Sequence, residues 1–346
     1  MDKFNGVTRD RLEEILSRMD NVKSGILGDI CLDVYWHADM RKSELSRETP
    51  HYMLPVVEER MSPGGGANVA ANMAALKPKS VNVFGVTGSD WRGRELIRLL
   101  SEQGIGVNGV VTGTGFSNAY IKPMRQGYSD VIYEDPRLDF ISHEPISSEI
   151  EDKLIAALDK AVGDLDVLCV SDQLSFGVVT RRVREHICGL ARRGLRVVAD
   201  SRYNIGLFTD VFLKPNELEG ATAAGMDSAA LSGVSDYERV AQALATKTGC
   251  DVFMTIGDKG SIYVKDRKSR HIPARKLSGP IDIVGAGDSS ISGFALALAA
   301  GAEAWEAAFI AGLCSEITVQ QVGITGTASR KQLLDWYTHS ISKTNA

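Results

Sequence analysis

Four residues near the C-terminal end of the chain, Gly285-Ala286-Gly287-Asp288, combine a flexible backbone with a carboxylate. Glycine lets a backbone turn sharply and approach a ligand closely. The first N–H groups of the helix expected over 288–300 have no partner inside that helix, and they attract an anion. A carboxylate at this place can take a proton from an attacking hydroxyl while the N–H groups stabilise a transferring phosphoryl group. We favour this catalytic interpretation over the alternative, in which Asp288 is only a helix N-cap.

A glycine-rich loop at 63–70, which opens a predicted helix, is the second candidate. Gly64 and Gly65 allow the backbone to approach a ligand, and Asn68 on the first helical turn offers both a donor and an acceptor. Such groups suit a substrate that is rich in hydroxyl groups. Asp33 follows a buried strand and is a further polar candidate. The ordinary alternatives are a helix-start residue for Asn68 and a turn residue for Asp33, and the residues alone leave both open.

Strands and helices alternate along most of the chain, and they must position these groups. The predicted strands are 24–33, 54–59, 81–86, 166–170, 195–200, 211–213, 251–256 and 261–264, and the predicted helices are 8–19, 94–102, 148–162, 177–193, 235–248, 288–300, 303–320, 329–339 and one that ends near 76. This alternation predicts an α/β fold, with a mostly parallel sheet and helices on both of its faces. Ligands of such sheets bind at the carboxyl ends of the strands, where the candidate residues fall.

Two stretches break the alternation. Short runs at 107–111, 119–124 and 131–133 are typical of antiparallel strands rather than of βα units. We expect segments 34–60 and 115–137 to form a small β-lid over the cleft, and the whole chain, 1–346, to be a single domain with this lid. Strands of the lid can pair across subunits, so we also expect a homodimer formed through the lid.

The bulk composition excludes several classes. The net charge of -5 gives no basic surface for nucleic acid, and the five cysteines have no paired spacing for a zinc site or a disulfide framework. The polar N-terminus is not a signal peptide, and no predicted helix is long and apolar enough to enter a membrane. We therefore expect a cytoplasmic protein whose partner is a small molecule. The chain lacks G-x-x-x-x-G-K-[ST], so it is not a P-loop NTPase.

Residues 285–288 and the loop at 63–70 together resemble the two signatures of the ribokinase (PfkB) family of carbohydrate kinases. The resemblance extends over nearly the whole chain and implies a ribokinase-like, doubly wound sheet with a β-lid. In that family the Gly-Ala-Gly backbone is the anion hole and the Asp is the catalytic base. The resemblance therefore assigns the anion hole to Gly285, Ala286 and Gly287, and the base to Asp288.

The same resemblance assigns ligand contacts to other positions of the chain. Asp33, Gly64, Gly65 and Asn68 match the sugar-binding positions. Asn216 and Glu219 resemble the N-x-x-E motif that holds Mg²⁺ and phosphate, chiefly through water, although their spacing alone favours a plain helix start. The nucleotide-binding candidates are Lys214, Asn216, Thr255, Gly257 and Gly260, of which the last three also fit an ordinary hairpin turn.

Within the family, the chain most resembles the kinase domain of the bifunctional heptose-7-phosphate kinase/adenylyltransferase. The implied reaction is transfer of the γ-phosphoryl group of ATP to the anomeric hydroxyl of a heptose 7-phosphate, with Mg²⁺ as cofactor. The sequence leaves undecided whether K⁺ is also required. Lys122 and Arg125 in the lid are expected to meet the substrate phosphate. The alternatives are another sugar kinase, of the ribose, fructose or ketodeoxygluconate type, or a non-catalytic sugar or nucleotide sensor on the same fold.

Overall fold

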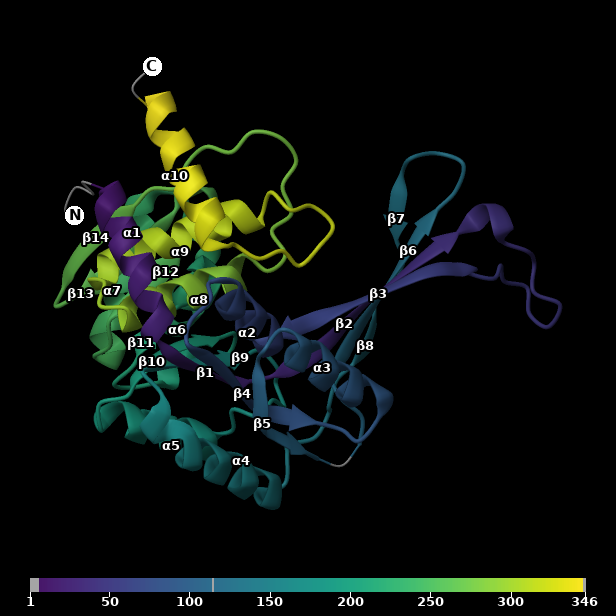
Figure 1. Cartoon of the computed structure of the whole chain (residues 1–346), viewed down its shortest axis with the longest axis horizontal. Coiled ribbons are helices and arrows are strands. Elements are labelled where there is room, and N and C mark those ends of the chain that lie inside the picture. The colour runs from purple at the N-terminus through teal and green to yellow at the C-terminus, as the bar shows by residue number, and fades with distance from the viewer. Residues whose placement is uncertain (1–5, 114, 345–346) are drawn as a thin grey trace.

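The computed structural model describes residues 6–113 and 115–344, with side chains described up to residue 338. Within these residues the chain forms a body around a large sheet, from which a second sheet projects (Figure 1). No helix in the described ranges is both long and apolar enough to cross a bilayer.

The large sheet has nine strands in the order β14-β13-β12-β11-β10-β9-β1-β4-β5. In chain order these are β1 (Lys23–Gly28), β4 (Ser80–Thr87), β5 (Gly106–Thr112), β9 (Val167–Asp172), β10 (Arg196–Ser201), β11 (Phe212–Leu213), β12 (Val252–Thr255), β13 (Ser261–Lys265) and β14 (Lys268–Ile272). The strands from β5 to β12 pair in parallel, whereas β12, β13 and β14 pair antiparallel.

Helices cover both faces of this sheet. They are α1 (Arg9–Arg18), α2 (Gly66–Ala75), α3 (Trp91–Glu102), α4 (Ser148–Ala161), α5 (Arg181–Arg192), α6 (Glu217–Ala224), α7 (Val234–Thr248), α8 (Ala286–Ala299), α9 (Ala304–Thr318) and α10 (Arg330–Thr344). Successive strand residues point to opposite faces, so Ile26 joins one apolar cluster with α1, α2, α8 and α9, and Leu27 joins another with α4, α5 and α7. The predicted α/β architecture is therefore confirmed.

The second sheet contains β2 (Ile30–Asp39), β3 (Val56–Gly65), β6 (Ala119–Gln126), β7 (Ile132–Glu134) and β8 (Leu138–Phe140). β2 pairs with β3 antiparallel and with β6 in parallel, and β7 and β8 both pair with β6. We call this sheet the lid sheet. Segments 34–60 and 115–137 supply most of it, and it extends away from the body (Figure 1).

The structure corrects the prediction of one strand over 24–33. The chain leaves the large sheet at Asp29, so that β1 and β2 belong to different sheets. The carboxylate of Asp29 accepts hydrogen bonds from the backbone N–H groups of Gln173, Leu174 and Val178, at 2.8 Å each. These three bonds hold the crossing point against the loop after β9, and Asp29 is a structural residue.

One further prediction was wrong, and another was only partly confirmed. The run at 107–111 is not antiparallel, because α3 carries the chain across and β5 pairs in parallel with β4. The run at 119–124 lies in β6, which is antiparallel to β7 and β8 but parallel to β2. Sequence reasoning also missed β14, whose residues Lys268–Ile272 are mostly polar and give no apolar alternation.

Candidate active site

Helix α8 begins directly after Gly285, whose φ of +81° is a left-handed conformation that favours glycine. A Cβ atom at Gly285 would lie 3.3 Å from both the Asn68 amide nitrogen and a methyl group of Thr325, so the turn is also closely packed. The N–H group of Ala286 donates to the carbonyl of Ile283 at 3.2 Å. The N–H groups of Gly285, Gly287 and Asp288 have no hydrogen-bond acceptor among the described residues, so they are available to an anion.

Asp288 faces the second glycine-rich motif. Its carboxylate accepts a hydrogen bond from the amide nitrogen of Asn68, at 2.6 Å. Asn72, one turn further along α2, donates to the side-chain oxygen of Asn68 at 3.2 Å, so the amide group can only turn its nitrogen toward Asp288. The hydroxyl of Ser292 on α8 donates to the carbonyl of Val69 on α2, at 2.9 Å. The two motifs, more than 200 residues apart in the chain, therefore form one site.

The pKa of Asp288 is raised to about 7. Burial is the main cause, because it disfavours the charged carboxylate, and the charges of Asp200 and Asp33 act in the same direction. The hydrogen bond from Asn68 and the charge of Lys214 act in the opposite direction. A pKa near neutrality is the value that suits a general base at physiological pH.

Asp33 lies across the site, on β2, and is buried. A Cβ atom at Gly64 would stand 2.8 Å from the Asp33 carboxylate, so only glycine leaves room for this side chain. No described residue donates a hydrogen bond to the carboxylate. Burial raises the pKa of Asp33, while the charges of Lys122, Arg137 and Arg60 lower it. A buried acid without a donor is suited to accept hydrogen bonds from ligand hydroxyl groups.

Three cations of the lid sheet surround this acid. Lys122 donates to the hydroxyl of Tyr35 at 3.0 Å, and Arg60 stacks over the Tyr35 ring at 4.0 Å while it donates to the carbonyl of Gly323. Arg137 stacks over the ring of Tyr120 at 4.5 Å. We call Arg60, Lys122 and Arg137 the lid cations.

The predicted phosphate contact Arg125 lies elsewhere. Its guanidinium pairs with Asp135 at 2.9 Å and stacks over Tyr133 at 5.8 Å, toward the outer part of the lid sheet. Sequence reasoning missed Arg60, which follows a predicted edge strand without any distinguishing pattern. Arg137 lies in the loop between β7 and β8. The sequence resemblance includes residues 137–140, but it gives Arg137 no role in the site.

Asn216 and Glu219, the predicted metal-binding residues, form a capping box at the start of α6. The side chain of Asn216 accepts from the N–H groups of Leu218 and Glu219, and Glu219 Oε2 accepts from the N–H group of Asn216 at 2.9 Å. Within residues 6–113 and 115–344, no three His, Cys, Asp or Glu side chains are grouped to bind a metal. Among the residues that the structure describes, none donates a hydrogen bond to Glu219 Oε1. These groups fit a hydrated Mg²⁺ that is carried by nucleotide phosphates, not an ion held directly by the protein.

The remaining nucleotide-binding candidates lie beside this helix start. Thr255 ends β12 and forms a parallel bridge with Asn216, so the two predicted motifs are neighbours. Gly257 has a φ of +59° and Gly260 a φ of +98°. A Cβ atom at Gly260 would stand 2.1 Å from the carbonyl oxygen of Ile272, so glycine is required there by packing against the end of β14.

Gly260→Ala is therefore expected to lower the free energy of unfolding by at least about 2 kcal/mol, because it adds a clash to a backbone conformation that alanine avoids. Denaturant unfolding measures this effect. The matched control is Gly189→Ala in the interior of α5, where only the flexible ends of Arg192 and Arg193 are near and about 0.5–1 kcal/mol of stabilisation is expected. Unchanged stability in Gly260→Ala would contradict the packing argument.

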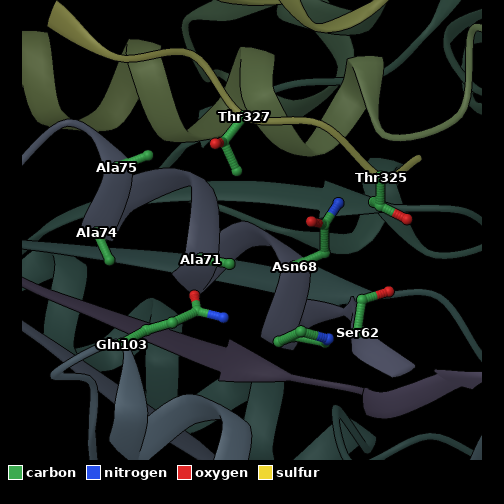
Figure 2. Close-up of a pocket in the computed structure, with 9 residues that line it drawn as sticks. Ser62, Asn68, Ala71, Ala74, Ala75, Gln103, Thr325 and Thr327 are labelled. Atoms are coloured by element: carbon green, nitrogen blue, oxygen red, sulfur yellow. The ribbon is translucent and has the colours of Figure 1, made fainter. Parts of the chain in front are cut away.

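A cavity of about 400 Å³ opens beside Asn68 (Figure 2). It runs along the alanine face of α2 and is walled by the segment that holds Thr325 and Thr327, with Gln103 at its far end. The described residues that line it include no charged side chain. Hydroxyl, amide and methyl groups of this kind suit the uncharged part of a polyhydroxylated ligand.

Two solved kinases share this fold. Phosphofructokinase-2 from Escherichia coli, in complex with fructose-6-phosphate, has a TM-score of 0.72 and 18% identity, over 92% of this chain and 99% of that one. Ribokinase from Arabidopsis thaliana, complexed with ribose and ATP, has a TM-score of 0.68 and 18% identity, over 91% and 98% of the two chains. At such low identity the likeness establishes the predicted ribokinase-like fold.

Sequence comparison establishes the class. Residues 207–331, which include the anion-binding turn and Asp288, match the family model described as pfkB family carbohydrate kinase. The chain therefore carries a domain of the pfkB carbohydrate kinase family, as predicted. Members of this class are phosphotransferases with an alcohol group as acceptor, and the predicted enzyme class is confirmed at this level.

The curated relatives of the chain include the bifunctional protein HldE from Geotalea uraniireducens, 29% identical over 333 residues, and HldE from Citrifermentans bemidjiense, 30% identical over 333 residues. These matches cover 94% and 93% of this chain, respectively. They cover 65% of each relative, so the chain spans slightly less than two thirds of the length of these proteins.

Proposed function

We propose that this chain is a single ribokinase-like kinase domain that transfers the γ-phosphoryl group of ATP to a hydroxyl of a sugar phosphate. The observation that carries the proposal is the carboxylate of Asp288, which is partly exposed and accepts a hydrogen bond from Asn68 at 2.6 Å. It lies beside three N–H groups that have no acceptor among the described residues. An acid whose pKa is near neutrality and an anion-binding backbone are the two parts that phosphoryl transfer to an alcohol requires.

Each group has a distinct role in the proposed reaction. Asp288 takes the proton of the attacking hydroxyl, and the N–H groups of Gly285 and Gly287 bind the oxygens of the transferring phosphoryl group. Asp33 and Asn68 orient the acceptor by hydrogen bonds to its hydroxyl groups. Mg²⁺, when bound with the nucleotide, neutralises charge on the phosphate oxygens, and Asn216 and Glu219 are the groups that would hold its water shell.

The lid cations support a phosphorylated acceptor. All three lid cations lower the pKa of Asp33 through their charge. They therefore lie on the same side of the site as Asp33, where the acceptor is proposed to bind. Arg137 is already paired with Asp139, at 2.7 Å, whereas Arg60 and Lys122 form no ion pair among the described residues. A neutral sugar gives these two cations no counter-charge, whereas a phosphate group pairs with them. Together with the resemblance to HldE, this favours a heptose 7-phosphate, phosphorylated at its anomeric hydroxyl. Another sugar phosphate is the alternative.

The test is an ATP-consumption assay over a panel of matched free and phosphorylated sugars, with Mg²⁺ and with or without K⁺. Turnover of a sugar phosphate, with the corresponding free sugar at least about tenfold poorer in kcat/KM, is the expected result. Binding of sugars without any ATP consumption would favour the alternative of a non-catalytic sensor.

The pH dependence of the reaction follows from Asp288. Because the base must be ionised, kcat/KM is expected to rise with pH up to an apparent pKa of about 7 and then to level off. Initial rates at fixed ionic strength between pH 5 and about pH 9 measure this profile. A profile that is flat across this range would contradict the role of Asp288 as base.

We also propose that the chain forms a homodimer through the lid sheet. Several apolar side chains of the lid are exposed; they are Met53, Leu54, Val56, Val57, Val131, Ile132 and Tyr133. Exposed apolar groups concentrated on one small sheet and its adjoining loops are typical of an interface. Sedimentation of the chain and of Val57→Glu is the test, and a monomer at all concentrations would contradict this proposal.

A further inference from the structure

Lys214 is a buried lysine at the centre of the candidate site. It follows β11 and is 2% exposed, and its backbone N–H group donates to the carbonyl of Ala199 at 2.8 Å. Its ammonium forms an ion pair with Asp200 at 2.6 Å. The other oxygen of Asp200 accepts from the amide of Gln173 at 3.1 Å, so the pair is held from two sides.

The ammonium of Lys214 lies directly beneath the first turn of α8. A methyl group added at Gly287 would stand 3.8 Å from Lys214 Nζ. The negative charges of Asp200, Glu219 and Asp288 all favour the protonated form of this lysine and raise its pKa. Three carboxylates therefore surround one ammonium, at the place where the proposed reaction brings in the negative charge of a nucleotide.

We propose that Lys214 is a positioning residue for phosphoryl transfer: Asp200 holds its ammonium beneath Gly287, from where its charge supports the anion-binding turn and the ionised form of Asp288. This inference rests on the proposed kinase function and adds a role for a buried ion pair to it. Sequence reasoning gave Lys214 a direct contact with phosphate. The ion pair and the burial instead indicate an action through Gly287 and Asp288.

The free-energy cost of burying the Lys214–Asp200 ion pair bears on the role of the pair. Taking an ammonium and a carboxylate out of water is unfavourable, and an apolar pair of similar volume is often at least as stable. An ion pair is therefore a poor choice if stability is its only role. A fixed positive charge, which needs no reorganisation when the phosphoryl charge develops, is a good choice for catalysis.

The charged groups around Asp288 determine the direction in which each substitution should shift its pKa. The charge of Lys214 favours the carboxylate, whereas those of Asp200 and Asp33 disfavour it. Cys31, on β2, is close enough for the charge of Asp288 to act on it, but its own pKa is raised well above the usual value by burial, so it stays neutral. Loss of Lys214 and loss of Asp200 should therefore shift the pKa of Asp288 in opposite directions, and loss of both should nearly cancel.

The experiment compares the full chain with Lys214→Met, Asp200→Asn and the double variant. Lys265→Met, an exposed lysine on β13 that pairs with Asp251 at 3.8 Å, is the control. Two readouts are used: kcat and KM for ATP, and a carbon-13 NMR titration of aspartate carboxyl groups in which Asp288 is identified by its loss in Asp288→Asn. The titration needs no activity, so it tests the inference even if no sugar is phosphorylated.

We expect Lys214→Met to lower kcat by about tenfold or more while KM for ATP changes less than about threefold. The apparent pKa of Asp288 should rise in Lys214→Met, fall in Asp200→Asn and stay close to that of the unaltered chain in the double variant. The control should change none of these values. If Lys214→Met does not fold because it leaves Asp200 unpaired, the double variant and Asp200→Asn still carry the test.

Two outcomes would overturn the inference. A large rise in KM for ATP with kcat intact would mean that Lys214 contacts the nucleotide directly. An unchanged titration of Asp288 in Asp200→Asn, and in Lys214→Met if that variant folds, would mean that the ion pair is only structural.

Discussion

Asp288→Asn is expected to lower kcat by about 10²- to 10⁴-fold, the range that a general base contributes. Asparagine keeps the shape of the side chain and can still contact Asn68, but it cannot accept a proton from the attacking hydroxyl. The N–H groups of Gly285 and Gly287 are unchanged, so nucleotide binding should be retained. Steady-state kinetics, combined with calorimetric titration of ATP into the variant, measure the two quantities separately.

The stability of the same variant is its control. The pKa of Asp288 is raised in the folded chain to about 7, above the value of 3.8 expected for an exposed aspartate, so the ionised carboxylate destabilises the fold at alkaline pH. Asp288→Asn should therefore unfold at a higher temperature than the unaltered chain at about pH 8, and the difference should shrink as the pH falls toward 4. Near-normal turnover in this folded variant would remove the assignment of the base.

The second large effect is expected in the lid cations. Arg60→Met and Lys122→Met should each lower kcat/KM for a phosphorylated acceptor by about 10- to 100-fold, because a charge-assisted hydrogen bond contributes about 1.5–3 kcal/mol. For the matching free sugar the change should stay within about threefold, since no phosphate is present to lose its partner. The ratio of the two effects, measured by initial rates, identifies the phosphate-binding side of the acceptor site.

Arg125→Met is the matched control for the lid. It removes a cation of the same sheet that forms an ion pair with Asp135. Arg125 is not among the cations that lower the pKa of Asp33. Little change with either acceptor is expected. Equal losses with free and phosphorylated sugars in Arg60→Met and Lys122→Met would mean that these side chains only hold the lid sheet in place, through Tyr35 and Gly323.

Most elements of the fold could be predicted because their apolar residues follow a clear period. The helices α1, α3, α7 and α9 lie close to the predicted ranges, and so do the buried strands β4, β9 and β10. The partition into two sheets could not be predicted at Asp29. The residues on both sides of it are equally apolar, and only the three N–H donors after β9 show why the chain changes sheet there.

The residues of the candidate site also divide into those that the sequence could predict and those that it could not. Asp288, Asn68 and the glycines could be predicted as candidates, because a glycine turn before a helix serves few functions and two such turns in one chain narrow the choice of function further. Among the lid cations, only Lys122 was predicted, through the family resemblance. Arg60 was not predicted, because its stacking contact with Tyr35 depends on which lid strands are neighbours. Register between strands far apart in the chain leaves no local pattern of residues.

The amino-acid sequence by itself determined the class of sheet, the anion-binding turn and the identity of the acid beside it, because these depend on local periodicity and on backbone freedom. The tertiary structure alone decided that Asn68 orients this acid, that Lys214 is tied to Asp200 beneath the turn, and that Arg60 rather than Arg125 faces Asp33. The reason is physical: burial, the distance between charges and the pKa of a carboxylate are set by packing between segments up to 220 residues apart.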